Sequence, residues 1–306
     1  MRAIKKILIA NRSEIAIRIS RAATELGYKT VSIYSYEDRF ALHRFKTDES
    51  YLVGSGLGPI QAYLDYKGIV QIALNSGCDA IHPGYGFLSE NPEFADECAK
   101  HNILFVGPSS KIMRSLGNKV EAKKTANKAK VPTIPSTGPL PRDIKKCKVL
   151  AKKIGYPIML KASWGGGGRG MRVIRKENEL ENQINTARRE AKSAFGKDDV
   201  FFEKLIEKAF HVEVQIIGDT HGNIVHLFER DCSLQRRHQK VVERAPAAYL
   251  SDKEREAICQ AGVRIGKQVD YSCAGTVEFL MDAKSREFFF IEVNPRVQVE
   301  HTVTEE

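Results

Sequence analysis

Near its end the chain reads Glu287-Phe288-Phe289-Phe290-Ile291-Glu292-Val293-Asn294-Pro295-Arg296-Val297-Gln298-Val299-Glu300-His301, and this stretch decides the fold that the sequence predicts. Polar residues occupy every second position: Glu292, Asn294, Arg296, Gln298 and Glu300. In an extended chain that period places these side chains on one face and the apolar residues on the other. We therefore predict a strand here, although a plain surface strand shows the same alternation.

The segment immediately before it, Ala274 to Asp282, is also predicted to be a strand, joined by a turn over residues 283–287. If Asp282 lies opposite Phe288, then Phe279 lies opposite Ile291 and Glu278 opposite Glu292. Directly paired side chains have Cβ atoms about 4.5–5.5 Å apart, and like charges there are unfavourable. A divalent cation between the two carboxylates, with Asn294 as a third ligand, removes that repulsion. Hard oxygen ligands of this kind favour Mg²⁺ or Mn²⁺.

Composition sets the broad class. The chain has 306 residues, 42% of them hydrophobic, enough for two or three domains with buried cores. Its apolar runs are too short to span a membrane, and residues 1–11 are typical of a first strand and not of a signal peptide. Six scattered cysteines indicate neither zinc nor a disulfide framework, which favours a reducing cytoplasm.

The charge is uneven. The net charge is +10, and residues 107–200 carry 22 Lys and Arg against 8 Asp and Glu, a net of +14. Few aromatic residues and no nucleic-acid motif accompany this basic segment, which argues against a nucleic-acid partner. A polyphosphate substrate or ordinary solvated lysines explain it better.

Residues 1–106 are predicted to form a doubly wound α/β domain. A strand over 6–11, a helix over 13–26 and a strand over 29–35 form a βαβ unit, and the pattern recurs up to residue 106. The first turn lacks the glycines of a dinucleotide site. The glycine-containing loop 82–91 follows a strand, so it either lines a site or is an ordinary turn in which Ser89 caps the next helix.

The middle of the chain combines lysines with glycines. Residues 107–133 are predicted to be a helical linker, in which nothing local distinguishes Lys119 from Lys111, Lys123, Lys124, Lys128 and Lys130. Residues 134–205 contain the run Gly165 to Gly170 between two strands, and such a backbone can fold over a phosphate chain. Lys161, on the strand before the glycines, is placed to meet the phosphates as a point charge. The alternative is an inert hairpin.

Residues 206–306 complete the chain. A hairpin is predicted from strands over 211–217 and 224–229. The basic segment 230–240 is either a solvated turn or part of an anion site. Ser251 and Glu254 form a capping box that starts a helix running to about Lys267.

These motifs together resemble the biotin carboxylase domain of the biotin-dependent carboxylases, in the ATP-grasp superfamily. The resemblance runs from Ile7 to Glu306 and rests on residues 10–16, 82–91, 161–172, 230–246 and 290–304. Residues 38–46 and 58–64 look most like the pyruvate carboxylase branch. The implied fold is a doubly wound N-terminal domain followed by an ATP-grasp fold, with an α+β flap domain and an incomplete C-terminal domain.

The resemblance also implies roles for individual residues. ATP phosphates are bound by Lys119, Lys161, Gly167 and Gly168. The adenine is held by Glu203, Lys204, Leu205 and Ile206, and further nucleotide contacts come from His211, Gln235 and His238. The ligands of Mg²⁺ (or Mn²⁺) are Glu278, Glu292 and Asn294. Bicarbonate is bound by Lys240, Arg296, Gln298, Val299 and Glu300, of which Lys240, Arg296 and Glu300 are catalytic and Glu300 is the base.

The implied activity is ATP-dependent carboxylation of carrier-bound biotin by bicarbonate, through carboxyphosphate. Implied partners are a biotinyl carrier domain or protein, a carboxyltransferase domain of the full-length enzyme and, optionally, a second copy of the chain. Phe210 departs from the family pattern beside the adenine wall. The family's third domain continues beyond Glu306, so we expect an incomplete fragment that is weakly active or inactive alone. The alternatives are another ATP-grasp carboxylate–amine ligase and a nucleotide-binding fragment without activity of its own.

Overall fold

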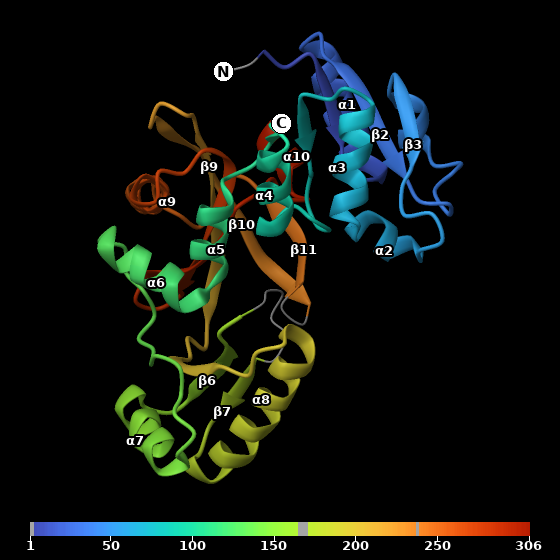
Figure 1. Cartoon of the computed structure of the whole chain (residues 1–306). Coiled ribbons are helices and arrows are strands. Elements are labelled where there is room, and N and C mark those ends of the chain that lie inside the picture. Colours follow the sequence, from blue (N-terminus) through green and yellow to red (C-terminus); the bar gives the residue numbers. More distant parts are fainter. Residues whose placement is uncertain (1–2, 165–170, 237–238) are drawn as a thin grey trace.

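The computed structural model describes residues 3–164, 171–236 and 239–306, and these residues form three sheets (Figure 1). The first is a parallel sheet of order β3-β2-β1-β4-β5 near the N-terminus. The second is a small sheet of order β7-β6-β8, and the third is an antiparallel sheet of order β11-β10-β9-β12-β13. Within this described part of the chain, no helix is both long and apolar enough to cross a membrane.

The N-terminal sheet confirms the predicted doubly wound arrangement. Its strands are β1 (Lys6–Ile9), β2 (Lys29–Tyr34), β3 (Glu49–Leu52), β4 (Ala80–His82) and β5 (Leu104–Phe105), with helices α1 (Ser13–Glu25), α3 (Tyr66–Asn75) and α4 (Pro92–Lys100) between them. β3 and the short helices η1 (Leu42–Lys46) and α2 (Pro59–Leu64) were not predicted from the sequence. The strand order reverses between β1 and β4, and ligands of open α/β sheets bind at the carboxyl ends of the strands at such a reversal.

The loop after β4 therefore starts at the ligand-binding edge of this sheet. Tyr85 and Gly86 in that loop line the largest cavity described below. The cap of α4 is Asn91, whose side chain accepts from the backbone N–H of Phe94, so the predicted capping role of Ser89 is wrong. Asn91 takes the role because it directly precedes Pro92, the first residue of the helix.

Two helices follow the first sheet in the chain: α5 (Ser110–Gly117) and α6 (Lys119–Lys128). The small sheet contains β6 (Ile158–Ala162), β7 (Arg172–Ile174) and β8 (Val200–Lys204), and it packs with α7 (Ile144–Ile154) and α8 (Leu180–Phe195) around its own apolar core (Figure 1). The predicted strands on both sides of the glycine run are present. The glycines themselves, residues 165–170, lie outside the described residues.

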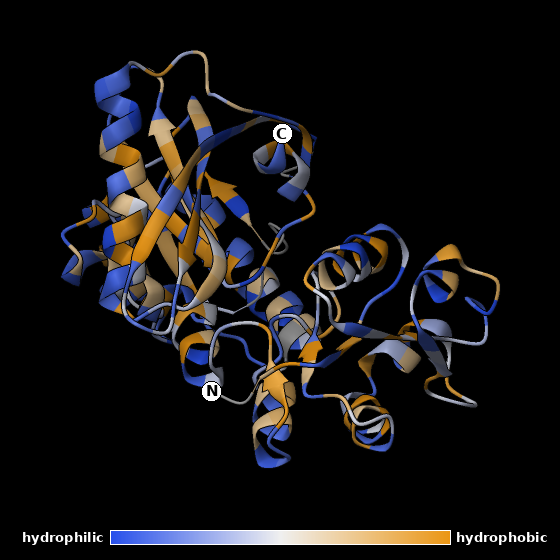
Figure 2. Cartoon of the chain, turned by 90° about the horizontal axis from the view of Figure 1, so that it is seen from above, coloured by the Kyte–Doolittle hydropathy of each residue, from blue (hydrophilic) through white to orange (hydrophobic). Residues whose placement is uncertain are grey.

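The antiparallel sheet carries most of the site. Its strands are β9 (Ala209–Gly218), β10 (Ile224–Arg236), β11 (Gln239–Arg244), β12 (Cys273–Asp282) and β13 (Phe288–Asn294). Helix α9 (Asp252–Gln268) packs on it closely, because a Cβ on Gly262 would lie 3.0 Å from Cγ1 of Val214. Figure 2 shows hydrophobic and hydrophilic residues alternating along many strands, and the hydrophobic ones of β9, β12 and β13 contribute to the apolar core beneath α9.

The described residues of segment 230–240, which are 230–236 and 239–240, do not form the solvated turn that was one of its two interpretations. β10 continues to Arg236 and pairs antiparallel with β11, with Gln235 opposite Lys240. The long β10–β11 ribbon carries part of this basic segment to the cavity, where Gln235 and Lys240 are among the lining residues.

The register of β12 and β13 confirms one half of the strand prediction. Glu278 lies opposite Glu292, as expected. The expected pairs Phe279–Ile291 and Asp282–Phe288 are wrong, because an irregularity after Glu278 shifts the register and places Phe279 opposite Phe290. β13 also ends at Asn294, and the short helix α10 (His301–Glu305) follows six residues later. The strand stops there because Pro295 has no N–H to donate to a sheet.

The predicted capping box is present, and its glutamate also ties α9 to the turn between β12 and β13. The carboxylate of Glu254 accepts from the N–H and hydroxyl of Ser251 and from Nε and Nη2 of Arg286, the latter two at 2.8 Å. The Arg286 bonds, followed by those of Ser251, lower the pKa of Glu254 to about 2. Its contribution to stability is therefore complete above the unfolded pKa, about 4.3, and is lost as the pH falls toward 2.

We expect Glu254→Gln to lower the free energy of unfolding at pH 7 by up to about 1 kcal/mol, and the difference from the unchanged protein to shrink between pH 5 and pH 3. Urea unfolding followed by circular dichroism across this pH range measures both quantities. Glu256→Gln, at an exposed position of the same helix, is the matched control and should give a flat difference. A flat difference for Glu254→Gln would contradict the expectation.

Candidate active site

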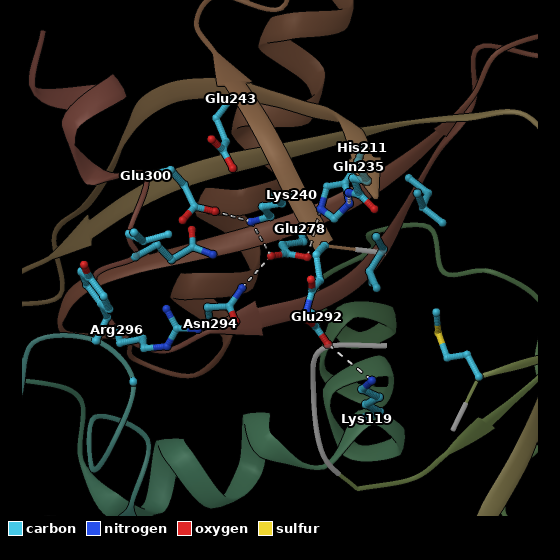
Figure 3. A pocket seen from close by; sticks show the side chains of 18 of the residues that line it. Lys119, His211, Gln235, Lys240, Glu243, Glu278, Glu292, Asn294, Arg296 and Glu300 are labelled. Atoms are coloured by element: carbon cyan, nitrogen blue, oxygen red, sulfur yellow. Dashed lines mark hydrogen bonds and ion pairs between the residues drawn. The ribbon is translucent and has the colours of Figure 1, made fainter. Parts of the chain in front are cut away.

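A cavity of about 600 Å³ opens where the three sheets meet. It is lined by the loop after β4, by α6, by β6, by the β10–β11 ribbon and by the two carboxylate strands (Figure 3). The structure brings the following predicted site residues together in its wall: Lys119, Lys161, His211, Gln235, Lys240, Glu278, Glu292, Asn294, Arg296, Gln298, Val299 and Glu300. The wall therefore gathers residues that lie far apart in the sequence.

Lys240 is the central cation of this cavity. Its ammonium group lies 2.6 Å from a carboxylate oxygen of Glu300 and 3.1 Å from one of Glu278, and it also contacts Glu213 (Figure 3). Burial disfavours the charged amine, but Glu278, Glu213 and Glu300 outweigh it and raise the pKa of Lys240 above its usual value. Lys240 is therefore a permanent positive charge beside Glu300.

Glu278 and Glu292 form the wall in which the metal site was predicted. Glu278 is 3.0 Å from Nε2 of His211 and accepts from Nδ2 of Asn294 at 2.8 Å. Burial opposes ionisation of Glu278, but His211 and Lys240 hold its pKa well below the usual range. Burial and the charge of Glu278 instead raise the pKa of Glu292, whose nearest described cation is Lys119 at 3.6 Å. The repulsion that a cation would relieve is thus present at this pair.

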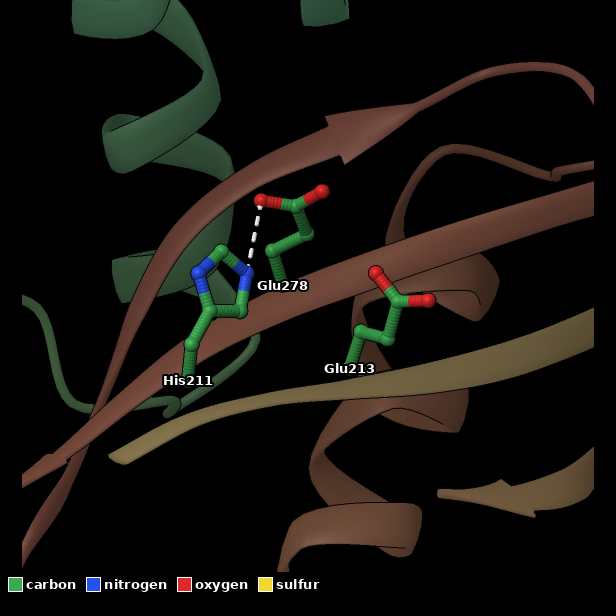
Figure 4. Close-up of side chains that lie close together, drawn as sticks. All are labelled: His211, Glu213 and Glu278. Atoms are coloured by element: carbon green, nitrogen blue, oxygen red, sulfur yellow. Dashed lines mark ion pairs between the residues drawn. The ribbon is translucent and has the colours of Figure 1, made fainter. Parts of the chain in front are cut away.

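His211, Glu213 and Glu278 form a second group in which one potential ligand atom from each residue lies within 4.8 Å of the others (Figure 4). A further group of this kind contains Glu213, Cys232 and Glu300. Basic side chains already neutralise the glutamates of both groups. Arg230 Nε donates to Glu213 at 2.5 Å, and the ammonium group of Lys240 contacts Glu213, Glu278 and Glu300. Burial lowers the pKa of His211, but Glu278 raises it by more. Glu292 has a single ion-pair partner among the described residues, Lys119 at 3.6 Å, so Glu278 and Glu292, with Asn294 beside them, remain the better candidates for metal ligands.

The cavity wall also contains Arg296, Gln298, Val299 and Glu300, the residues predicted to bind bicarbonate together with Lys240. Arg296 donates from Nε to Glu90 at 2.6 Å, and Arg230 donates from Nη2 to the side-chain oxygen of Gln298 at 2.9 Å. Val299 lines the cavity although 60% of its surface is exposed. Arg296 and Lys240 line the same cavity as Glu300, and this combination of groups can hold a small anion and accept a proton from it.

Three of the four residues predicted to hold the adenine line a second cavity, of about 570 Å³. It is lined by Lys204, Leu205 and Ile206, together with apolar residues that include Ile134 and Phe289. Glu203 is absent from the described linings of both cavities, and its carboxylate instead contacts Lys123 and Lys161. Gly167, Gly168 and His238 lie outside the described residues.

Phe210 stacks on Tyr249 with ring centroids 3.9 Å apart and packs against the apolar core of the antiparallel sheet. It is absent from the described linings of both cavities, so its departure from the family pattern falls in the packing beside the site.

Several residues of this region were missed by sequence reasoning, and three of them had a signal. Glu213 follows His211 by two positions on β9, so both point to the same face of the sheet. Lys123 follows Lys119 by one helical turn. Arg230 belongs to the basic segment 230–240 but is 1% exposed. Glu243 also lines the cavity, and burial and Glu300 raise its pKa.

Two family models together match nearly the whole chain. The biotin carboxylase N-terminal domain model matches residues 3–113, and the model of the ATP-binding domain of the carbamoyl-phosphate synthase L chain matches residues 118–306. Taken with the three sheets and the cavity between them, they define an ATP-grasp protein, and the predicted fold class is confirmed. More narrowly, the chain belongs to the biotin carboxylase family.

Relatives of known identity include pyruvate carboxylases. The chain is 56% identical to that of Bacillus subtilis (strain 168) over 99% of its length, and 52% identical to the mitochondrial one of Homo sapiens over 99%. It spans 26% of each of these relatives, about a quarter of their length.

Solved structures that resemble this chain are also pyruvate carboxylases and biotin carboxylases. Rhizobium etli pyruvate carboxylase with the allosteric activator acetyl coenzyme A has a TM-score of 0.93 at 60% identity, with 99% of this chain and 27% of that chain covered. A Campylobacter jejuni biotin carboxylase in complex with an ATP compound has a TM-score of 0.94 at 46% identity, covering 99% and 68%. The biotin carboxylase domain dimer of Hydrogenobacter thermophilus 2-oxoglutarate carboxylase, in complex with MgADP, ADP and bicarbonate, has 0.94 at 47%, covering 100% and 67%.

Proposed function

We propose that this chain carries the nucleotide-binding and bicarbonate-binding part of a biotin carboxylase, and that the enzyme is a pyruvate carboxylase. The observation that carries the proposal is one cavity whose wall combines two lysines, a pair of carboxylates, and two further cations beside a third carboxylate: Lys119, Lys161, Glu278, Glu292, Lys240, Arg296 and Glu300. Proteins of this family have been solved with an ATP compound, and with MgADP and bicarbonate.

The reaction is ATP-dependent carboxylation of carrier-bound biotin. Arg296 and Lys240 hold bicarbonate, and Glu300 accepts its proton. The resulting oxyanion attacks the γ-phosphorus of ATP, the bond to the β-phosphate oxygen breaks, and carboxyphosphate and ADP form. Lys119 and Lys161 neutralise charge on the phosphates, so the chain acts mainly through positioning and electrostatics. Carboxyphosphate then gives CO₂ and phosphate, the phosphate takes the N1 proton of biotin, and N1 binds CO₂.

Glu278, Glu292 and Asn294 would hold Mg²⁺ or Mn²⁺. The ion would supply Lewis-acid stabilisation of the phosphate oxygens. The adenine would occupy the second cavity beside Lys204, Leu205 and Ile206, and His211, Gln235 and His238 would add nucleotide contacts.

Bicarbonate-dependent release of phosphate from ATP tests the reaction. An amino-acid-dependent release without a bicarbonate effect would instead indicate a carboxylate–amine ligase. Calorimetric binding of MgATP with no phosphate release under either condition would indicate a nucleotide-binding fragment. Free biotin and a biotinylated carrier protein serve as carboxyl acceptors in the assay of bicarbonate-dependent phosphate release.

We expect EDTA to weaken ATP binding at least about tenfold, since the metal ion contributes several kcal/mol to charge stabilisation on phosphates.

We also expect Glu292→Gln to weaken Mn²⁺ binding about tenfold or more, because it removes one of the proposed metal ligands. Electron paramagnetic resonance measures this binding without any turnover. Glu287→Gln, just outside β13 on the same hairpin, is the control. Unchanged Mn²⁺ binding in Glu292→Gln would place the metal elsewhere.

The wider setting is part of the same proposal. We assign residues 1–106 to the N-terminal domain, 107–133 to the linker, 134–205 to the flap and 206–306 to the C-terminal domain. A biotinyl carrier and a carboxyltransferase domain are the expected partners, with a second copy of the chain as a further one and no nucleic acid. The described cysteines are all free, which fits a cytoplasmic location, and cell fractionation tests it.

A further inference from the structure

Lys123 is a buried lysine with a single described carboxylate partner. It lies on α6 one turn after Lys119, is 7% exposed, and is absent from the described linings of the two large cavities. Its ammonium group contacts a carboxylate oxygen of Glu203, lies 3.4 Å from the carbonyl oxygen of Ile134, and is 5.2 Å from the ring centre of Phe201. Lys123 therefore supplies a counter-charge to Glu203, and removing one partner of such a buried pair leaves the other charge unpaired.

Glu203 lies between two lysines. One of its carboxylate oxygens contacts Lys123 and the other contacts Lys161. Lys161 lies opposite Phe201 in the pairing of β6 with β8, so its side chain is on the same sheet face as Glu203. The side chain of Glu203 is 4% exposed and that of Lys161 is 12% exposed. Of the two lysines, only Lys161 lines the cavity where we place the ATP phosphates.

Lys161 must therefore leave Glu203, at least in part, when it binds a phosphate. A buried carboxylate that loses its only cation is strongly destabilised. Lys123 removes this difficulty because it remains on the other carboxylate oxygen. The charge on Glu203 thus stays neutralised whether Lys161 points toward the carboxylate or toward the cavity.

We propose that Lys123 is a positioning residue that keeps Glu203 paired and so frees Lys161 to transfer from Glu203 to the phosphates of the nucleotide. The inference rests on the proposed function, because it assumes that Lys161 binds phosphates. Lys123 itself touches no substrate. Its role is to set how strongly Glu203 competes with the nucleotide for Lys161.

Calorimetric titration with MgATP tests the proposal. We expect Lys123→Met to weaken MgATP binding at least tenfold, because Glu203 then retains Lys161 as its only cation. In a steady-state assay KM for ATP should rise while kcat changes less than threefold. Lys123→Arg should stay within threefold of the unchanged protein. The control is Lys124→Met on the same helix, where Lys124 pairs only with Glu121 among the described residues and is 63% exposed.

The double variant Lys123→Met/Glu203→Gln separates this role from a purely structural one. It buries no unpaired charge at this position, so it remains informative if Lys123→Met fails to fold. We expect it to bind MgATP within threefold of the single variant Glu203→Gln, since a neutral amide does not hold Lys161 whether or not Lys123 is present. A double variant that binds MgATP at least tenfold more weakly than Glu203→Gln alone, or a Lys123→Met that binds normally, overturns the proposal. Failure of the unchanged protein to bind MgATP overturns the proposed function instead.

Discussion

Replacing Arg230 by methionine is expected to lower the free energy of unfolding by about 3–5 kcal/mol, the usual effect of removing one partner of a buried ion pair. Arg230 is 1% exposed and lies on β10, between β11 and β9 in the antiparallel sheet. Its guanidinium group donates to Glu213, Gln215, Thr276, Gln298 and Thr304. Methionine fills much of the same volume but leaves Glu213 with Lys240 as its remaining described cation.

The same substitution should disturb the anion pocket, because Arg230 holds both Gln298 and α10, the helix that directly follows Glu300. Urea unfolding followed by tryptophan fluorescence and circular dichroism measures the loss. Arg236→Met is the matched control on the same strand, and it should stay within about 0.5 kcal/mol because Arg236 is exposed. A loss below about 1 kcal/mol for Arg230→Met would show that the buried network contributes little net stability.

Replacing Glu300 by glutamine is expected to reduce bicarbonate-dependent ATP hydrolysis by about 10²–10⁴-fold, the contribution of a positioned general base. Glu300 lines the same cavity as Lys240 and Arg296 and is 6% exposed. Glutamine keeps the shape and can still contact Lys240, but it cannot accept the proton of bicarbonate. Phosphate release with and without bicarbonate, at saturating MgATP, measures the effect.

MgATP binding provides the internal control for this variant. It should stay within about threefold, since Lys119 and Lys161 are on other elements, α6 and β6. Hydrolysis near the original rate would remove Glu300 from the role of base. Loss of MgATP binding together with hydrolysis would show instead that the charge balance around Lys240 had failed. Glu300→Asp should recover part of the rate because it restores the carboxylate.

The strands that carry Glu278 and Glu292, β12 and β13, show best how much of the structure could be predicted from the sequence. The pairing of Glu278 with Glu292 followed from strand period and a short turn, and the structure has it. The pairs beyond it were wrong, because a one-residue shift in register depends on packing along the whole strand. The end of β13 at Asn294 could have been predicted from Pro295. Yet the polar residues after it still line the cavity.

The sequence alone was enough to predict features that depend on residues close together in the chain. These are the βαβ unit, the capping box at Ser251, the strands on both sides of the glycine run, and the pairing of Glu278 with Glu292. Which charged side chains form ion pairs with one another could be learned from the tertiary structure alone. In the sequence nothing local distinguishes Lys119 from the neighbouring lysines, whereas in the structure its Nζ lies 3.6 Å from a carboxylate oxygen of Glu292. Arg230, Glu213 and Lys123 are buried because strands and helices from distant segments enclose them. Charge pairing of this kind depends on distances in space, which residue order does not specify.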